Sequence, residues 1–297
     1  MGAVSSFAQF MSRNGDSPIV VKMSWSDYNN SDSKYKKMDK MAKISPTTCF
    51  NADDFHLPVV GIAADMPVHD SGQHRHERHQ LLFSAAGCIS IEMETKVYLL
   101  PPGRAVWIPA GVLHRAFMRG VIAYRSLYFS TDLALRQIPL QIFEVNPLLF
   151  EVIERMAFWP WDMSAESQNS LLTVFMEELK TAPKENWGLS FPQDRRLSVW
   201  IERIRKGELP LRLNLFAQQA GACERTISRI FIKETGMNYQ NWRQQWRLLK
   251  AIEMLAEKRY MSEIAQTLEF TSDSAFIAFF RQHTGVTPTG YTSKDKQ

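Results

Sequence analysis

Cysteine is scarce in this chain, which has three among 297 residues. Cys49, Cys88 and Cys223 lie far apart and form no Cys-x-x-Cys pair. Their odd number and wide spacing argue against a disulfide framework. Isolated free thiols are typical of proteins that stay in a reducing compartment, so we expect a cytoplasmic protein.

Long apolar runs are also missing. No stretch of about 18 apolar residues occurs, so we expect no transmembrane helix and no membrane partner. The first residues lack the basic stretch and apolar core of a secretory signal. What is present is ordinary for a globular protein: 45% of the residues are apolar and 22% are charged, in a chain long enough for two domains.

Positive charge is concentrated in the last third of the chain. Residues 194–297 hold 17 Lys and Arg against 11 Asp and Glu, whereas residues 1–193 hold 18 against 20. A basic segment beside a mildly acidic one indicates that the C-terminal part binds a polyanion, although many solvated helices are also basic.

Changes of pattern predict five segments. Residues 1–48 are polar with no hydrophobic period and predict a disordered tail. Residues 49–145 contain short apolar runs separated by Gly and Pro, which predicts an antiparallel β-barrel. Apolar residues recur at helical spacing in residues 146–181. Residues 182–194, with Pro183, Gly188 and Pro192, predict a linker to a helical domain at 195–297.

The apolar stripe at residues 171–179, in the third segment, has two interpretations. It can form a dimer or interdomain contact, or it can pack inside one protomer.

The C-terminal domain contains an internal repeat. Phe231-Ile-Lys-Glu-Thr-Gly236 reappears as Phe280-Arg-Gln-His-Thr-Gly285, and an aromatic residue follows each glycine six positions later. A short helix with an Ala pattern precedes each copy. The repeat predicts two helix-turn-helix units, joined by a long helix at residues 239–257.

Each unit has a second helix with an apolar back and a polar front. In the first unit, Gly221 supplies the turn with positive φ before that helix. Cationic and hydroxyl side chains on the exposed face suit the DNA major groove. The candidate DNA contacts are Arg225, Thr226, Ser228, Arg229 and Lys233 in the first unit, and Ser272, Asp273, Ser274 and Ile277 in the second.

These features resemble the AraC/XylS family of transcription regulators. The resemblance covers about 100 residues and includes Glu224-Arg-Thr-Ile-Ser-Arg-Ile-Phe231, Trp242-Arg-Gln-Gln, Ser274-Ala-Phe276 and Gly285-Val-Thr-Pro288. It implies an all-α domain of seven helices. Glu269 departs from the family pattern because it stands where the second unit usually has its turn glycine, and Ala278 stands where a basic residue is frequent.

Four of the seven histidines lie between positions 74 and 114. The segments His74-Arg-His-Glu-Arg-His-Gln80 and Gly103 to His114 resemble the two motifs of the cupin superfamily, which is similar to the sensor half of many AraC-type regulators. The resemblance implies ligand positions His74, His76, Gln80 and His114, where Gln80 replaces the usual carboxylate. Residues two apart on a strand share a face, so His74 and His76 can both point inward, whereas His79 points to the other face.

Three interpretations of this cluster stay open. The imidazoles of His74, His76 and His114 can hold a divalent metal, which they are chemically suited to do. Alternatively, they and Gln80 form a metal-free pocket that binds a small-molecule effector by hydrogen bonds. In the third interpretation they satisfy each other and have only a structural role.

The sequence as a whole predicts a two-domain α+β protein with a cupin-like antiparallel β-barrel and helices followed by a double helix-turn-helix domain. It predicts a regulator that binds double-stranded DNA under the control of a small molecule, with a homodimer and RNA polymerase as further partners. The competing hypothesis is a cupin enzyme with a helical appendage. The carboxylate missing at Gln80 and the repeated helix-turn-helix unit argue against catalysis.

Overall fold

The computed structural model describes residues 50–66, 68–118, 122–133 and 138–294. The predicted tail at residues 1–48 lies outside the described residues. The tail and the domain boundaries drawn from the sequence therefore stay predictions.

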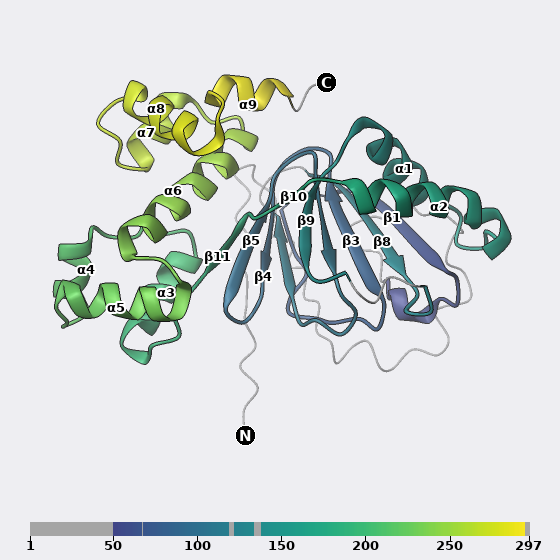
Figure 1. The fold of residues 1–297 in the computed structure, drawn as a ribbon, viewed down its shortest axis with the longest axis horizontal. Helices are drawn as coiled ribbons and strands as arrows, with labels where there is room; N and C mark the ends of the chain where they lie inside the picture. Colours follow the sequence, from purple (N-terminus) through teal and green to yellow (C-terminus); the bar gives the residue numbers. More distant parts are fainter. Residues whose placement is uncertain (1–49, 67, 119–121, 134–137, 295–297) are drawn as a thin grey trace, which may run out of the picture. The chain divides into compact units, whose positions relative to one another are not determined.

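The N-terminal part of the described chain forms two antiparallel sheets (Figure 1). One has six strands in the order β1-β8-β3-β6-β9-β10, and the other has five in the order β11-β5-β4-β7-β2. The strands are β1 (Val59–Met66), β2 (His69–Asp70), β3 (His79–Ser84), β4 (Ile89–Glu92), β5 (Lys96–Leu100), β6 (Arg104–Ile108), β7 (Arg115–Met118), β8 (Ile122–Phe129), β9 (Gln141–Glu144), β10 (Lys184–Glu185) and β11 (Gly188–Ser190). The predicted antiparallel β domain with attached helices is confirmed, whereas closure into a barrel stays a prediction.

Strand β3 lies inside the larger sheet and is covered on both faces, since all six of its residues are buried. Leu81 and Phe83 belong to the core beneath the helices α1 (Pro147–Ala157) and α2 (Ala165–Thr181). Leu82 belongs to the core between the two sheets. Because side chains alternate along a strand, Gln80 shares the face of Leu82 and points between the sheets.

Helices α1 and α2 begin where the sequence pattern turned helical. The Asn146 side chain accepts a hydrogen bond from the Leu149 amide at 2.8 Å, which caps the first turn of α1. The helices cover β1 and β8 (Figure 1). In α2, the stripe contributes buried Leu172, Phe175 and Leu179 to this core, so these side chains pack inside one protomer.

The segment predicted to be a linker contains paired strands. Within residues 182–194, β10 pairs with β9 in the larger sheet and β11 pairs with β5 in the smaller one. Strand β11 leads directly to the helical part of the chain.

The C-terminal helices repeat as the sequence predicted. They are α3 (Ser198–Arg205), α4 (Leu213–Gln219), α5 (Glu224–Thr235), α6 (Tyr239–Ala256), α7 (Met261–Thr267), α8 (Asp273–Thr284) and α9 (Pro288–Lys294). Helices α4 and α5 form the first helix-turn-helix unit, α7 and α8 form the second, and α6 joins them. None of the helices in the described part of the chain is both long and apolar enough to span a membrane.

Both copies of the repeated motif end their helix in the same way. The Thr235 hydroxyl donates to the Phe231 carbonyl at 2.7 Å, and the Thr284 hydroxyl donates to the Phe280 carbonyl at 2.8 Å. The glycine that follows each threonine has a φ of 75° or 78°, in the left-handed region. The repeated sequence motif therefore forms the same C-terminal helix cap in both units.

Candidate functional site

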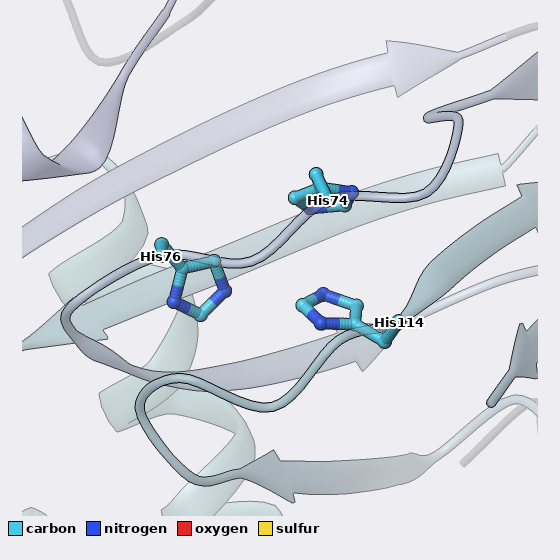
Figure 2. A group of neighbouring side chains, drawn as sticks. All are labelled: His74, His76 and His114. Atoms are coloured by element: carbon cyan, nitrogen blue, oxygen red, sulfur yellow. The ribbon is translucent and has the colours of Figure 1, made fainter. Parts of the chain in front are cut away.

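The three predicted ligand histidines come together in the structure. The centres of the His74 and His114 rings lie 4.4 Å apart, and the His76 ring lies 5.2 Å from His114 (Figure 2). One ligand nitrogen from each ring lies within 4.8 Å of the others. His74 and His76 reach this position from the loop between β2 and β3, not from a strand as expected. His74 forms an isolated β-bridge with His114 instead.

Each of the three rings is oriented by a backbone carbonyl. The Nδ1 atoms of His74, His76 and His114 lie 3.1, 2.6 and 2.9 Å from the carbonyls of Gly72, Arg78 and Val112. A carbonyl oxygen only accepts, so Nδ1 carries the proton in each neutral ring and the lone pair is left on Nε2. A metal-binding histidine usually has this arrangement, with its second nitrogen bonded to a backbone carbonyl.

Burial keeps two of these rings neutral. Burial, opposed by the bond to Val112 and assisted by the neighbouring His74 and His76, lowers the pKa of His114 to about 4. Burial also lowers the pKa of His74. Near neutral pH both imidazoles are therefore in the form that binds a metal or accepts a hydrogen bond.

Gln80 places a neutral amide beside the cluster. Its Oε1 atom lies 3.1 Å from Nε2 of His76, and its Nε2 atom donates to the hydroxyls of Ser126 and Tyr128 at 2.8 and 3.1 Å. Since Nδ1 of His76 already carries the proton, the Nε2–Oε1 pair is two acceptors facing each other. Such a pair needs a proton or a cation between its members, or the opposite orientation of the amide.

The sequence reasoning missed the partners on β8. Tyr124, Ser126 and Tyr128 alternate along that strand, and register pairs Tyr128 with Gln80. Burial raises the pKa of both tyrosines, so their hydroxyls stay protonated. The alternation of hydroxyl side chains was the available signal, but the strand pairing that brings them to Gln80 was not visible in the sequence.

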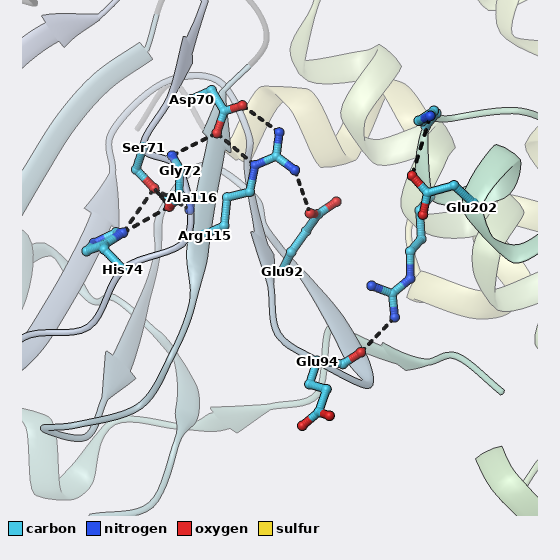
Figure 3. Close-up of polar contacts among 11 residues, drawn as sticks. Asp70, Ser71, Gly72, His74, Glu92, Glu94, Arg115, Ala116 and Glu202 are labelled. Atoms are coloured by element: carbon cyan, nitrogen blue, oxygen red, sulfur yellow. Dashed lines mark hydrogen bonds and ion pairs between the residues drawn. The ribbon is translucent and has the colours of Figure 1, made fainter. Parts of the chain in front are cut away.

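A polar network holds the loop that carries His74 (Figure 3). Asp70 accepts from the Gly72 amide at 2.9 Å and forms an ion pair with Arg115, which also contacts Glu92 at 3.3 Å. Arg115 lowers the pKa of Asp70. The Ser71 hydroxyl accepts from the amide of Ala116 at 2.9 Å, which joins the loop to β7.

His79 lies apart from the cluster, as its position in the strand predicted. Its ring stacks on Trp107 at 5.4 Å, and its Nδ1 atom accepts from the Ala110 amide at 3.1 Å. This contact places it on the other face of β3.

The predicted DNA-contacting side chains of the first unit lie on one face of α5. Arg225, Arg229 and Lys233 are exposed, whereas Ile227, Ile230 and Phe231 are buried behind them. Within the part of the chain that the structure describes, these three cations form no ion pair. They are therefore available to a polyanion. Thr226 and Ser228 are half-buried beside them.

The second unit presents a less basic face. Asp273, Ser274, Ile277 and Ala278 are exposed on α8. The Ser272 hydroxyl accepts a hydrogen bond from the Ala275 amide at 3.1 Å, so this residue caps the helix. The two faces differ as the sequence predicted, with the cationic one in the first unit.

Comparison with known proteins agrees with both halves of this description. Residues 56–172 match a family model described as an AraC-like ligand binding domain, and residues 216–294 match one described as a helix-turn-helix domain. The chain is 28% identical to the HTH-type transcriptional regulator NimR of Escherichia coli over 225 residues, which are 74% of this chain and 82% of that protein. It is 36% identical to RipA of Corynebacterium glutamicum over 81 residues, 27% of this chain and 24% of RipA.

Solved structures of similar proteins include two full regulators. ToxT of Vibrio cholerae matches 79% of this chain and is itself covered to 97%, with a TM-score of 0.32 and 11% identity. The AraC-like transcriptional activator CuxR matches with a TM-score of 0.35 and 14% identity over 67% of this chain and 79% of CuxR. With scores this low, the assignment of the chain rests on the sequence matches.

Proposed function

Because the chain belongs to the AraC family of transcriptional regulators and is not an enzyme, we propose that the histidine cluster is its effector site. A small molecule bound at His74, His76, Gln80 and His114 would control the binding of DNA by the C-terminal helices.

The arrangement of the three imidazoles is the observation that carries this proposal. All three keep Nδ1 on a backbone carbonyl, and His74 and His114 leave Nε2 to a shared space, while Nε2 of His76 faces the Gln80 amide. A cluster with only a structural role would use both nitrogens of each ring inside the protein. Unused nitrogens that are held in position suit a ligand that is present only part of the time.

A divalent metal is the second candidate for this space. Donors around a zinc ion, about 2 Å from it, lie roughly 3.4 Å apart. The three nitrogens lie within 4.8 Å of one another, so they would have to move inward to bind one ion. His76 and Gln80 already direct two acceptors at each other, which a cation would resolve. A metal held here would supply positive charge and a coordination position for the effector.

Metal content distinguishes the two candidates. The full-length protein, purified without chelator and dialysed against one equivalent of Zn²⁺, Ni²⁺, Co²⁺ or Mn²⁺, is assayed by elemental analysis. The metal proposal predicts about one ion per chain, lost in the His74→Ala, His76→Ala, His114→Ala triple variant and kept in His283→Ala. A stoichiometry near zero in the wild type rejects it and leaves the metal-free pocket.

We propose that α5 makes the main base contacts. Its exposed Arg225 and Arg229 can bond bidentately to guanine, with Thr226, Ser228 and Lys233 beside them. On α8, the expected contacts are Ser272, Asp273, Ser274 and Ile277, which offer hydroxyls and one apolar surface. Selection of duplexes from a random library by the full-length protein tests this. Recovery of no preferred sequence would reject specific binding.

We also propose a homodimer that forms through α1 and α2. After the α2 stripe is buried inside the protomer, Leu148, Phe158 and Val174 remain 52%, 45% and 38% exposed. Light scattering tests this proposal: we expect a dimer for the wild type and a monomer for Leu148→Glu. A monomeric wild type would contradict it. A contact with RNA polymerase stays a prediction.

A further inference from the structure

The turn of the second helix-turn-helix unit has a glutamate where the first has a glycine. Gly221 has a φ of 62° and Glu269 has a φ of 54°. The hydrogen bonds around them agree: the Gly221 amide donates to the carbonyl of Gln218, and the Glu269 amide donates to that of Gln266. Glu269 therefore holds a left-handed conformation that disfavours a side chain. The side-chain contacts of Glu269 act against that strain.

The carboxylate of Glu269 is held by arginines. Its Oε2 atom lies 2.9 Å from Nη2 of Arg243 and 3.8 Å from Nε of Arg212. The Arg243 side chain, on the joining helix α6, is 9% exposed, whereas the Glu269 side chain is 48% exposed, so a buried guanidinium meets a carboxylate at the protein surface.

Arg243 connects the two units. Its Nε atom donates to the Pro210 carbonyl at 2.7 Å, just before α4 of the first unit. The same guanidinium reaches Glu269 in the turn between α7 and α8. One buried side chain on α6 therefore contacts the start of the first unit and the turn of the second.

A second buried arginine adds positive charge near the carboxylate. Arg247 lies one helical turn after Arg243, with its guanidinium 3.7 Å from the centre of the Phe270 ring. Burial and the charge of Arg243 lower the pKa of Arg247 to about 10, and Glu269 opposes that decrease. Like charges four residues apart on a helix repel. Without Glu269, the cations at 212, 243 and 247 would lose the carboxylate that offsets their repulsion.

We propose that Glu269 is a positioning residue, which through Arg243 fixes the second helix-turn-helix unit against the first and so sets the spacing of α5 and α8. Two recognition helices can read one duplex only if their separation matches successive positions in its groove. A glycine at 269 would relax the turn but release this connection. This inference rests on the proposed function and adds to it the residue that fixes the spacing of α5 and α8.

The first experiment measures the spacing without DNA. Nitroxides on the exposed Cys223 and on Ala278→Cys, in full-length protein carrying Cys49→Ala and Cys88→Ala, report the distance between the start of α5 and the middle of α8 by pulsed electron resonance. We expect one narrow distribution in this background and a broader one with Glu269→Gly or Glu269→Gln. Glu263→Gln, which removes an exposed ion pair with Arg259, is the matched control. Unchanged distributions in both Glu269 variants would overturn the proposal.

The second experiment tests the consequence for DNA. The probe is the duplex selected by the wild type, with and without one base pair inserted between its two halves. We expect the insertion to weaken wild-type binding about tenfold and to matter less than about threefold for Glu269→Gln. If the insertion weakens binding by the same factor in both proteins, the positioning role is refuted. If Glu269→Gln in that case also binds the unmodified duplex more weakly than the wild type, the substitution has destabilised the protein generally. If the wild type selects no duplex, DNA reading fails, and the distance measurement still decides the role of Glu269.

Discussion

Acid should destabilise the metal-free protein through His114, which is 1% exposed. Burial holds its pKa near 4 in the folded chain, against 6.5 when unfolded. Because the folded value is the lower one, the unfolded chain takes up the proton first as the pH falls. Stability is therefore lost between pH 6.5 and about pH 4, below which both states are protonated.

The size of this effect follows from the two pKa values. At pH 5 the unfolded ring is almost fully protonated and the folded ring is about one-tenth protonated, which corresponds to a loss of about 2 kcal/mol relative to pH 7.5. The loss approaches about 3 kcal/mol below pH 4. His74 acts in the same direction, since burial lowers its pKa as well.

Urea unfolding at pH 7.5 and pH 5, followed by tryptophan fluorescence in the presence of a chelator, measures this loss. We expect His114→Asn to lose about 2 kcal/mol less than the wild type between the two pH values. His283→Asn, which changes an exposed histidine on α8, should lose as much as the wild type. If His114→Asn shows the same loss as the wild type, the buried ring is not the cause and the reasoning fails.

Three further predictions concern the two halves of the chain. Arg225→Ala should weaken binding to the selected duplex by about 1–3 kcal/mol, measured against a scrambled duplex at one salt concentration. Ser274→Ala should weaken it clearly less, and the reverse order would contradict the roles given to α5 and α8. Gly61→Ala should lower the free energy of unfolding by roughly 2 kcal/mol or more, because the new Cβ would lie 2.2 Å from a backbone oxygen of α1; an unchanged urea midpoint would contradict this. A fragment of residues 188–297 keeps the Ser190 carbonyl that accepts from the Trp242 indole at 2.7 Å, and its DNA affinity should fall steeply with salt; a folded fragment with salt-independent affinity would refute it.

The sequence predicted the C-terminal domain well because its signals are local. Gly236 and Gly285 end helices, Asn238 caps α6, and the apolar residues of α5 recur at the spacing of one buried face. Each of these effects acts within a few residues, so the local sequence alone predicts it. The second helix-turn-helix unit carries the same motif, which supports the same prediction a second time.

The surroundings of the histidine cluster were predicted only in part because strand pairing is non-local. The four candidate side chains follow from the motif, but Ser126 and Tyr128 reach Gln80 through the register of β3 with β8. The connection from Arg243 to Glu269 spans 26 residues and depends on how α6 packs between the units. No spacing rule in the sequence gives either contact.

The two departures from the family patterns have a common physical consequence: each changes the charge of a cluster of polar side chains. At Glu269 a carboxylate is added, and it offsets the charge of neighbouring arginines. At Gln80 a carboxylate is lost, and the amide that replaces it bonds to Ser126 and Tyr128 and faces His76 without adding charge. Imidazoles bind metals in their neutral form, so a divalent cation held by this set would keep its full positive charge. An effector that completes such a site is favoured if it is an anion, whereas the metal-free cluster favours a neutral molecule that donates hydrogen bonds to the Nε2 atoms of His74 and His114.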